Sequence, residues 1–263
     1  MNQYDTERRL CWSYTIIAVA LGVSALCIAI PYNHWRATLD NCPGGYFENT
    51  NCGCILFGIS TYQYFNGGHN SLCLYAIIAP LPILAYAVIM ALFHMYRVCI
   101  NNIGQYEDDK STGMEEIEGE AIVVTTRTRI SKRNDSVIYC WIPTSSIAVL
   151  FGIYNLVHAS MLTAGLLKTC NQYRGYLVKQ VDAAGDHATA ILFRLTCQAI
   201  FDFMDYIQKD SLNSRRGDII NTGIALQMAV FASWVAVGFW IVVAIVTALR
   251  AYRERDVLTC CGN

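Results

Sequence analysis

Four long stretches of the chain contain no Asp, Glu, Lys or Arg: residues 10–32, 73–96, 137–167 and 222–249. A helix needs about 20 apolar residues to cross the hydrocarbon core of a membrane, and each stretch reaches that length. Only 15% of the 263 residues are charged, so little polar sequence remains to cover four buried helices in a soluble protein. The pattern therefore predicts an all-α membrane protein with a four-helix transmembrane bundle.

The first stretch follows Arg8 and Arg9, and basic residues also precede secretory signal peptides. Its apolar run is longer than the roughly 7–15 residues of a signal-peptide core. We therefore expect residues 10–32 to stay in the chain as a membrane anchor.

Basic residues near the ends of these stretches indicate the orientation of the chain, because such residues tend to stay in the cytosol. These basic residues lie in the N-terminal segment (1–9), the central loop (97–136) and the tail (250–263). We therefore expect these three segments, and with them both termini, to be cytosolic. Loops 33–72 and 168–221 are then extracellular. The second of them carries seven Lys and Arg residues, but long loops weigh less in the rule. We expect an integral protein of the plasma membrane or an endomembrane.

Six cysteines lie in or beside the two expected extracellular loops: Cys42, Cys52, Cys54, Cys73, Cys170 and Cys197. An even number suits disulfide formation in an oxidising compartment, so we expect both loops to be tied by disulfides. Because six cysteines allow 15 pairings, the sequence does not fix the connectivity. A bridge that joins the two loops is our prediction, and local pairing within each loop is the alternative. Zinc binding by Cys52 and Cys54 is not expected, since C-x-C alone is a weak pattern.

Three further cysteines are expected on the cytosolic side: Cys99 after the second stretch, and Cys260 and Cys261 in the tail. Cysteines beside a membrane face are candidates for reversible acylation. An acyl chain there would add membrane affinity through its buried methylenes. Reduced, unmodified thiols are the alternative.

Small residues at helical spacing indicate where helices pack, since association in lipid depends on close approach of the backbones. Gly22 lies in the first stretch, and Ala225, Ala229 and Ser233 recur every four residues in the fourth. We expect these residues to pack helices together within the chain. A dimer or partner-subunit face is the alternative.

Polar residues inside the stretches are few. Asn155 and His158 lie three apart on one face of the third stretch, and Gln227 lies in the fourth. A structural hydrogen-bonding role is the favoured interpretation, and a pH-sensing or transport role is the alternative. Without Asp, Glu, Lys or Arg in the stretches, we expect no buried charge for a proton relay. Pro80 and Pro82 predict a bend in the second stretch.

The second extracellular loop is predicted to be partly helical, because apolar residues recur at helical spacing across residues 186–208. Asp186 suits the N-cap of this helix. Asp202 and Asp205 are expected on its solvated face and not in a calcium site. In the first loop, residues 54–64 have the composition of a strand.

The fourth stretch and the tail resemble a known family. This part of the chain reads Gln227-Met-Ala-Val-Phe-Ala232-Ser233-Trp234-Val-Ala236 and ends Ala248-Leu249-Arg-Ala-Tyr252-Arg-Glu-Arg-Asp256-Val-Leu258. The glutamine, the Ala-Ser-Trp core and the basic-acidic tail are similar to the last helix of the transmembrane protein 179 family. The resemblance implies a four-span membrane protein without an established catalytic activity.

No Gly-rich phosphate loop, nucleophile elbow or zinc-protease motif occurs in the sequence, so we expect no enzyme activity, cofactor or metal. A net charge of −1 argues against a nucleic-acid partner. We expect a non-enzymatic tetraspan accessory subunit that contacts membrane lipid and binds another integral membrane protein, a channel or receptor. It would affect the assembly, trafficking or gating of that partner. The alternative is an oligomeric channel or transporter with a polar route near Asn155, His158 and Gln227.

Overall fold

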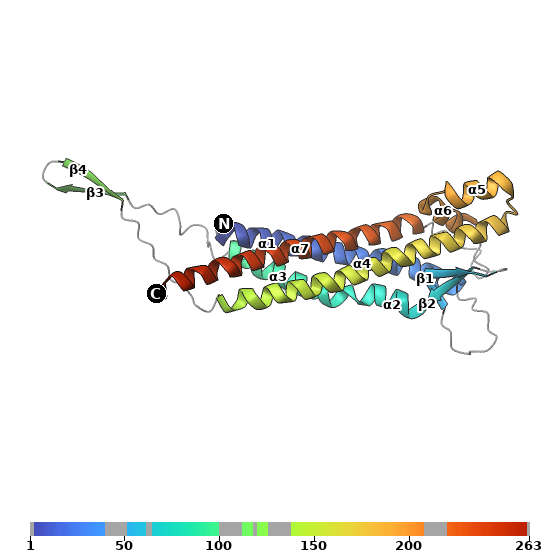
Figure 1. The fold of residues 1–263 in the computed structure, drawn as a ribbon, viewed down its shortest axis with the longest axis horizontal. Coiled ribbons are helices and arrows are strands. Elements are labelled where there is room, and N and C mark those ends of the chain that lie inside the picture. Colours follow the sequence, from blue (N-terminus) through green and yellow to red (C-terminus); the bar gives the residue numbers. More distant parts are fainter. Residues whose placement is uncertain are drawn as a thin grey trace.

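The computed structural model describes residues 3–39, 52–61, 65–99, 112–117, 120–125, 138–207 and 220–261. The described part of the chain is mostly helical (Figure 1). Its elements are, in order, α1 (Gln3–Leu39), β1 (Cys52–Ser60), β2 (Phe65–His69), α2 (Asn70–Ile78), α3 (Pro80–Cys99), β3 (Thr112–Ile117), β4 (Glu120–Thr125), α4 (Ile138–Gln180), α5 (Gly185–Phe193), α6 (Cys197–Ile207) and α7 (Thr222–Cys261).

Four helical segments are long and apolar enough to cross a membrane: Tyr4–Arg36, Asn70–Cys99, Trp141–Gln180 and Thr222–Arg253. Each of them contains one of the four charge-free stretches. The structure thus agrees with the predicted class, a helical membrane protein with four candidate spans.

α4 extends beyond the third charge-free stretch and reaches Gln180. Leu166, Cys170, Tyr173 and Leu177 follow one another at spacings of four, three and four residues, and all four are buried. One apolar stripe is enough to bury a helix against its neighbours while charged residues occupy the other faces. Residues expected in the extracellular loop therefore belong to this helix.

The second apolar stretch forms two helices, α2 and α3, which are interrupted at Ala79. Pro80 begins α3, and proline has no backbone N–H to donate to the carbonyl four residues earlier. The carbonyl of Ala76 consequently has no partner within its own helix. The interruption lies where the two prolines predict a bend.

The spanning helices pack in the order α3, α1, α7, α4, because α1 contacts both α3 and α7, and α7 also contacts α4. Ala229 and Ser233 are buried in α7, and Ala225 is half-buried. A methyl group added at Gly22 would lie 3.5 Å from the Cδ1 atom of Leu84, which is an ordinary contact. Small residues of α7 therefore face the chain's own bundle.

The β1–β2 hairpin and helices α5 and α6 lie together at one end of the bundle (Figure 1), and we call this group the cap. Both termini lie at the opposite end, the terminal end. β1 and β2 pair antiparallel with an irregular register, starting with Cys52 opposite His69. The strands approach closely at Gly68, where an added Cβ would lie 2.2 Å from the carbonyl oxygen of Leu56. β3 and β4 form a second antiparallel hairpin within the expected central loop.

The expected helix of the second loop is two helices, α5 and α6, separated at residues 194–196. Ala184 occupies the N-cap position of α5, so the prediction of Asp186 as N-cap was wrong by two residues. Asp186 lies instead in the first turn, where a carboxylate interacts favourably with the helix dipole.

Candidate functional site

Two disulfides tie the cap to the bundle, and both are local. Cys54 of β1 is bonded to Cys73 of α2, and Cys170 of α4 is bonded to Cys197 of α6. The predicted bridge between the two loops is therefore not formed by these four cysteines, and the local alternative is the correct one for them. Cys52 is also disulfide-bonded, while Cys42 lies outside the described residues.

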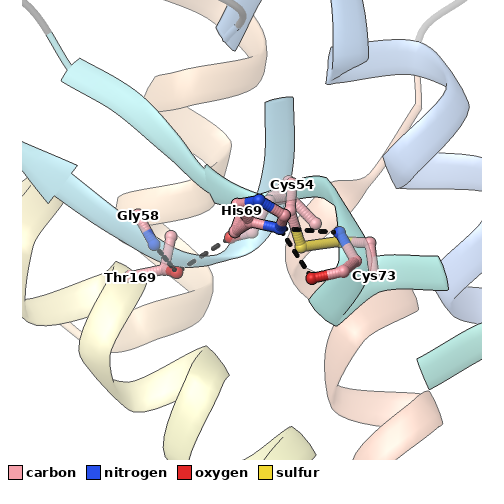
Figure 2. Close-up of a disulfide and its surroundings, with 7 residues drawn as sticks. Cys54, Gly58, His69, Cys73 and Thr169 are labelled. Atoms are coloured by element: carbon pink, nitrogen blue, oxygen red, sulfur yellow. Dashed lines mark hydrogen bonds between the residues drawn. A yellow bond between two sulfur atoms is a disulfide. The ribbon is translucent and has the colours of Figure 1, made fainter. Parts of the chain in front are cut away.

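Hydrogen bonds, and not the predicted disulfide, connect the first loop to the start of the second through β1 and Thr169 of α4 (Figure 2). The backbone N–H of Gly58 in β1 donates to the Thr169 hydroxyl oxygen of α4 at 3.0 Å. The same hydroxyl donates to the carbonyl oxygen of Ile55 at 2.8 Å. Thr169 is fully buried, so both bonds are shielded from water and hold β1 against α4.

Phe57, also in β1, completes this contact with α4. Its backbone has a φ of +60°, which is strained for a residue with a bulky side chain. The ring lies on Gly165, where an added Cβ would come within 2.8 Å of a ring carbon. The ammonium nitrogen of Lys168 lies 5.8 Å from the centre of the same ring, a cation–π contact. The strained backbone therefore places an aromatic ring between a glycine and a lysine.

His69 occupies the N-cap position of α2, beside the Cys54–Cys73 bridge (Figure 2). Its Nδ1 atom accepts from the Ser71 backbone N–H at 3.2 Å and lies 2.6 Å from the Ser71 hydroxyl oxygen. A side chain that accepts from the first turn satisfies one of the free donors of a helix N-terminus. The imidazole thus has a structural task at this position.

Asp205 joins α6 to the start of α7. One carboxylate oxygen accepts from the backbone N–H of Thr222 at 2.8 Å, and the other accepts from the Thr222 hydroxyl at 2.6 Å. That hydroxyl oxygen accepts in turn from the Trp35 indole N–H of α1 at 2.9 Å. Burial raises the pKa of Asp205, and its hydrogen bonds from Thr222 act against this shift. The expectation that Asp205 belongs to a solvated face was therefore wrong.

In the middle of the bundle, His158 supplies the partner that Pro80 removes. Its Nε2 atom lies 3.0 Å from the carbonyl oxygen of Ala76. A carbonyl oxygen only accepts, so Nε2 donates this hydrogen bond. The Ala76 carbonyl thereby gains the partner that Pro80 cannot supply. The bond joins α4 to α2 at a buried site. This geometry fits the structural role favoured for His158.

The structure does not bring the three intramembrane polar residues together. Asn155 is buried, and its Nδ2 atom donates to the Phe151 carbonyl of its own helix at 3.1 Å. Gln227 is exposed on the surface of α7, whereas His158 is buried. A polar route lined by Asn155, His158 and Gln227 has no support from this arrangement.

A cluster of ionisable side chains around the buried Glu7 lies near the terminal end, and it was not predicted from the sequence. Glu7 of α1 is 1% exposed and lies between two basic side chains of α3. Its Oε2 atom is 2.5 Å from Nδ1 of His94, and its Oε1 atom is 2.7 Å from Nη1 of Arg97. The ring of Tyr14 stacks on His94 with centroids 5.6 Å apart. The expectation of no buried charge concerned only the four charge-free stretches, and Glu7 is buried just outside the first of them.

A signal for this cluster exists in the sequence. Glu7 lies three residues before the first charge-free stretch, and Arg97 is the first residue after the second. An antiparallel pair of neighbouring spans brings those two ends together.

The cap exposes apolar and aromatic side chains on α5 and α6. No residue of α5 is buried, although the helix contains Ile191, Leu192 and Phe193. Phe193 is 78% exposed, and Tyr206 of α6 is 73% exposed. A cavity of about 450 Å³ opens between α5 and the end of α4, lined mainly by Ala and aliphatic side chains. Exposed apolar patches of this kind mark interaction surfaces.

The acylation candidates lie at the terminal end. Cys99 is the last residue of α3 and is exposed. Cys260 and Cys261 are the last two residues of α7, and their side chains lie outside the described part of the structure. Within the described residues, no group of three His, Cys, Asp or Glu side chains is placed to hold a metal ion.

These features define a helical protein of the integral-membrane class, with four candidate spans and a disulfide-tied cap. No family model matches the chain, and neither a curated protein nor a solved structure matches it. The resemblance to the transmembrane protein 179 family stays a prediction.

Proposed function

We propose that this protein is a non-enzymatic accessory subunit that binds another integral membrane protein, a channel or receptor, through its cap. The observation that carries the proposal is α5, an apolar helix without a single buried residue. Burying apolar side chains stabilises by about 25 cal/mol for each Å² removed from water. Phe193 is 78% exposed and Ile191 and Leu192 are only partly buried, so α5 forgoes part of that stabilisation until a partner covers it.

The covalent and hydrogen bonds that attach the cap to the bundle favour binding by a preformed surface. Cys170–Cys197 ties α6 to α4, and Asp205 ties α6 to the start of α7. A surface that is rigid before binding loses less conformational entropy when its partner docks. The cap therefore suits a stable subunit interface that affects assembly, trafficking or gating of the partner.

The orientation proposed with this function places the cap outside the cell or in the lumen. Disulfides form in oxidising compartments, and the terminal end carries the basic residues Arg8, Arg9, Arg97, Arg250 and Arg253. The only glycosylation sequon, Asn134-Asp135-Ser136, is then cytosolic and stays unmodified. A mobility shift on glycosidase treatment that Asn134→Gln abolishes would overturn this orientation.

Photo-crosslinking tests the interface. A benzoylphenylalanine replaces Phe193 or Tyr206 in the cap, and Tyr252, 65% exposed on α7, in the matched control. After irradiation of native membranes, the two cap positions are expected to give an adduct with an integral membrane protein, and the control position is not. The adduct at Tyr206 is expected to disappear in a Phe193→Ser variant. Recovery of free monomer alone, or of an adduct between two copies of this chain, would overturn the accessory role.

Acylation of the terminal end belongs to the same proposal, since an acyl chain adds membrane affinity. Fatty-acid labelling in cells is expected for the wild type, with its main loss in a Cys260→Ser/Cys261→Ser variant and a further loss when Cys99 is also replaced. Undiminished labelling after all three replacements would exclude these sites.

A further inference from the structure

A second cavity, of about 340 Å³, lies where the hairpin, the start of α2 and α4 meet. Its lining is Cys52, Phe57, Ile59, Gly67, Gly68, His69, Leu72 and Lys168. Apart from His69 and Lys168, the walls are apolar side chains and glycine backbone, and the lining includes no Asp or Glu. Charge complementarity therefore favours an anionic ligand with an apolar part.

The position of this cavity along the bundle matches the boundary between hydrocarbon and headgroups. Lys168 is the first charged residue after the charge-free stretch 137–167. On the facing element, the candidate span Asn70–Cys99 begins directly after His69, which lines the cavity. Two independent chain segments thus place the cavity at the same level, where lysine side chains extend towards phosphate groups.

An apolar seam continues from the cavity along α4 into the hydrophobic region. Ala164, Met161, Val157 and Tyr154 lie 4, 7, 11 and 14 residues before Lys168, and this spacing puts them on its face of the helix. None of the four is buried, and Val157 is 56% exposed. An acyl chain lying here would cover them.

Side chains of α2 form the other edge of this seam. Tyr75 lies one turn beyond Leu72, and its ring packs against that of Tyr154 with the two ring centroids 6.5 Å apart. His158 donates to Ala76 just behind it, so the two helices are held at a fixed separation. The seam is therefore a fixed apolar strip on the exposed surface of the two helices, over which one acyl chain would lie.

The lysine is held in place at the mouth of this seam. Its ammonium group lies 5.8 Å from the centre of the Phe57 ring, and that ring is fixed by the strained Phe57 backbone and by Gly165. Strained backbone persists only where the surrounding structure enforces it, and it concentrates at binding sites.

We infer that this cavity binds the phosphate-bearing headgroup of a glycerophospholipid, with Lys168 at the phosphate and one acyl chain along the seam. The ligand is recognised by its phosphodiester charge together with its chain, so neither part alone is sufficient. The site is independent of the partner surface on α5.

Native mass spectrometry of the full chain in mild detergent tests this inference. The probes are phosphatidylglycerol, diacylglycerol, which lacks the phosphate, and glycerophosphoglycerol, which lacks the chains. We expect retained adducts with phosphatidylglycerol only. In Lys168→Gln its affinity is expected to fall about fivefold, the effect of one basic residue near anionic lipid. Lys179→Gln removes the same charge from α4 outside the cavity and is expected to change the affinity less than twofold.

A second variant tests the seam with the lysine intact. Ala164→Trp fills the seam below the cavity and is expected to weaken phosphatidylglycerol binding while leaving the thermal stability unchanged. Equal losses in the two Lys→Gln variants, equal retention of diacylglycerol, or binding of glycerophosphoglycerol as tight as that of the lipid would each overturn the inference.

Discussion

The hydrogen bond between His158 and Ala76 predicts an energetic coupling between two residues that do not bond to each other. Replacing His158 by Leu leaves the Ala76 carbonyl without a partner, because Pro80 cannot supply one. Replacing Pro80 by Ala restores a backbone N–H four residues after Ala76. In that background, the loss of His158 is expected to cost less.

The size of the effect follows from the environment of the bond. An unsatisfied buried carbonyl costs about 1–3 kcal/mol in soluble proteins. Measured hydrogen bonds between membrane helices average only about 0.6 kcal/mol, with a maximum of about 1.7. We therefore expect His158→Leu to destabilise the wild-type background by about 1 kcal/mol beyond its packing effect. The coupling energy in the double-mutant cycle should be of the same size.

Unfolding of the four proteins of this cycle by SDS in mixed micelles measures the coupling. Asn155→Leu provides a matched control, since Asn155 donates to the carbonyl of Phe151 in its own helix. Its effect should add to that of Pro80→Ala within about 0.5 kcal/mol. If His158→Leu costs the same in both backgrounds, the proline does not create the need for this histidine and the reasoning fails.

Three further predictions concern the two ends of the bundle. Glu7→Gln leaves the buried His94 and the partly buried Arg97 without their carboxylate and should cost about 3 kcal/mol in SDS unfolding. The exposed Asp5→Asn should cost almost nothing, and equal costs would contradict a stabilising cluster. Replacing both Cys54 and Cys73 by Ser removes a disulfide with a sequence separation of 19 and should lower the free energy of unfolding by about 3 kcal/mol. Unchanged stability, either of this variant or of the reduced wild-type protein, would contradict this prediction. Burial raises the pKa of Asp205, so the folded state holds its proton more tightly. Its stability contribution should therefore grow as the pH falls towards about 4 and be lost as the pH rises through the folded-state pKa. Asp205→Asn should lack this pH dependence, and parallel stability–pH curves for variant and wild type would refute the assignment.

The contact between the two loops shows a limit of inference from residue types. An even number of cysteines in the two loops predicted disulfides, and disulfides are present. The link from β1 to α4, however, is made by Thr169, a residue that looks unremarkable in the sequence. A threonine hydroxyl gains importance only when two backbone groups of another segment come within reach of it.

The amino-acid sequence by itself determined the class of this protein. Charge-free stretches of sufficient length leave few alternatives to membrane-spanning helices, because hydrocarbon penalises every exposed charge and every unpaired backbone group. The prolines likewise predicted a bend from their missing N–H, and the structure interrupts the helix beside them, at Ala79.

Only the tertiary structure decided which face of each helix lies inside. A helix that is apolar all round carries no periodic signal for its orientation, so Asn155 and His158 could not be separated from Gln227. Packing buried the first two and left Gln227 exposed. It also brought Glu7 against His94 and Arg97, a pairing across the antiparallel helices α1 and α3 that flanking charges alone did not reveal. Helix rotation depends on the shapes of all the neighbours together, and that information is absent from any single stretch of sequence.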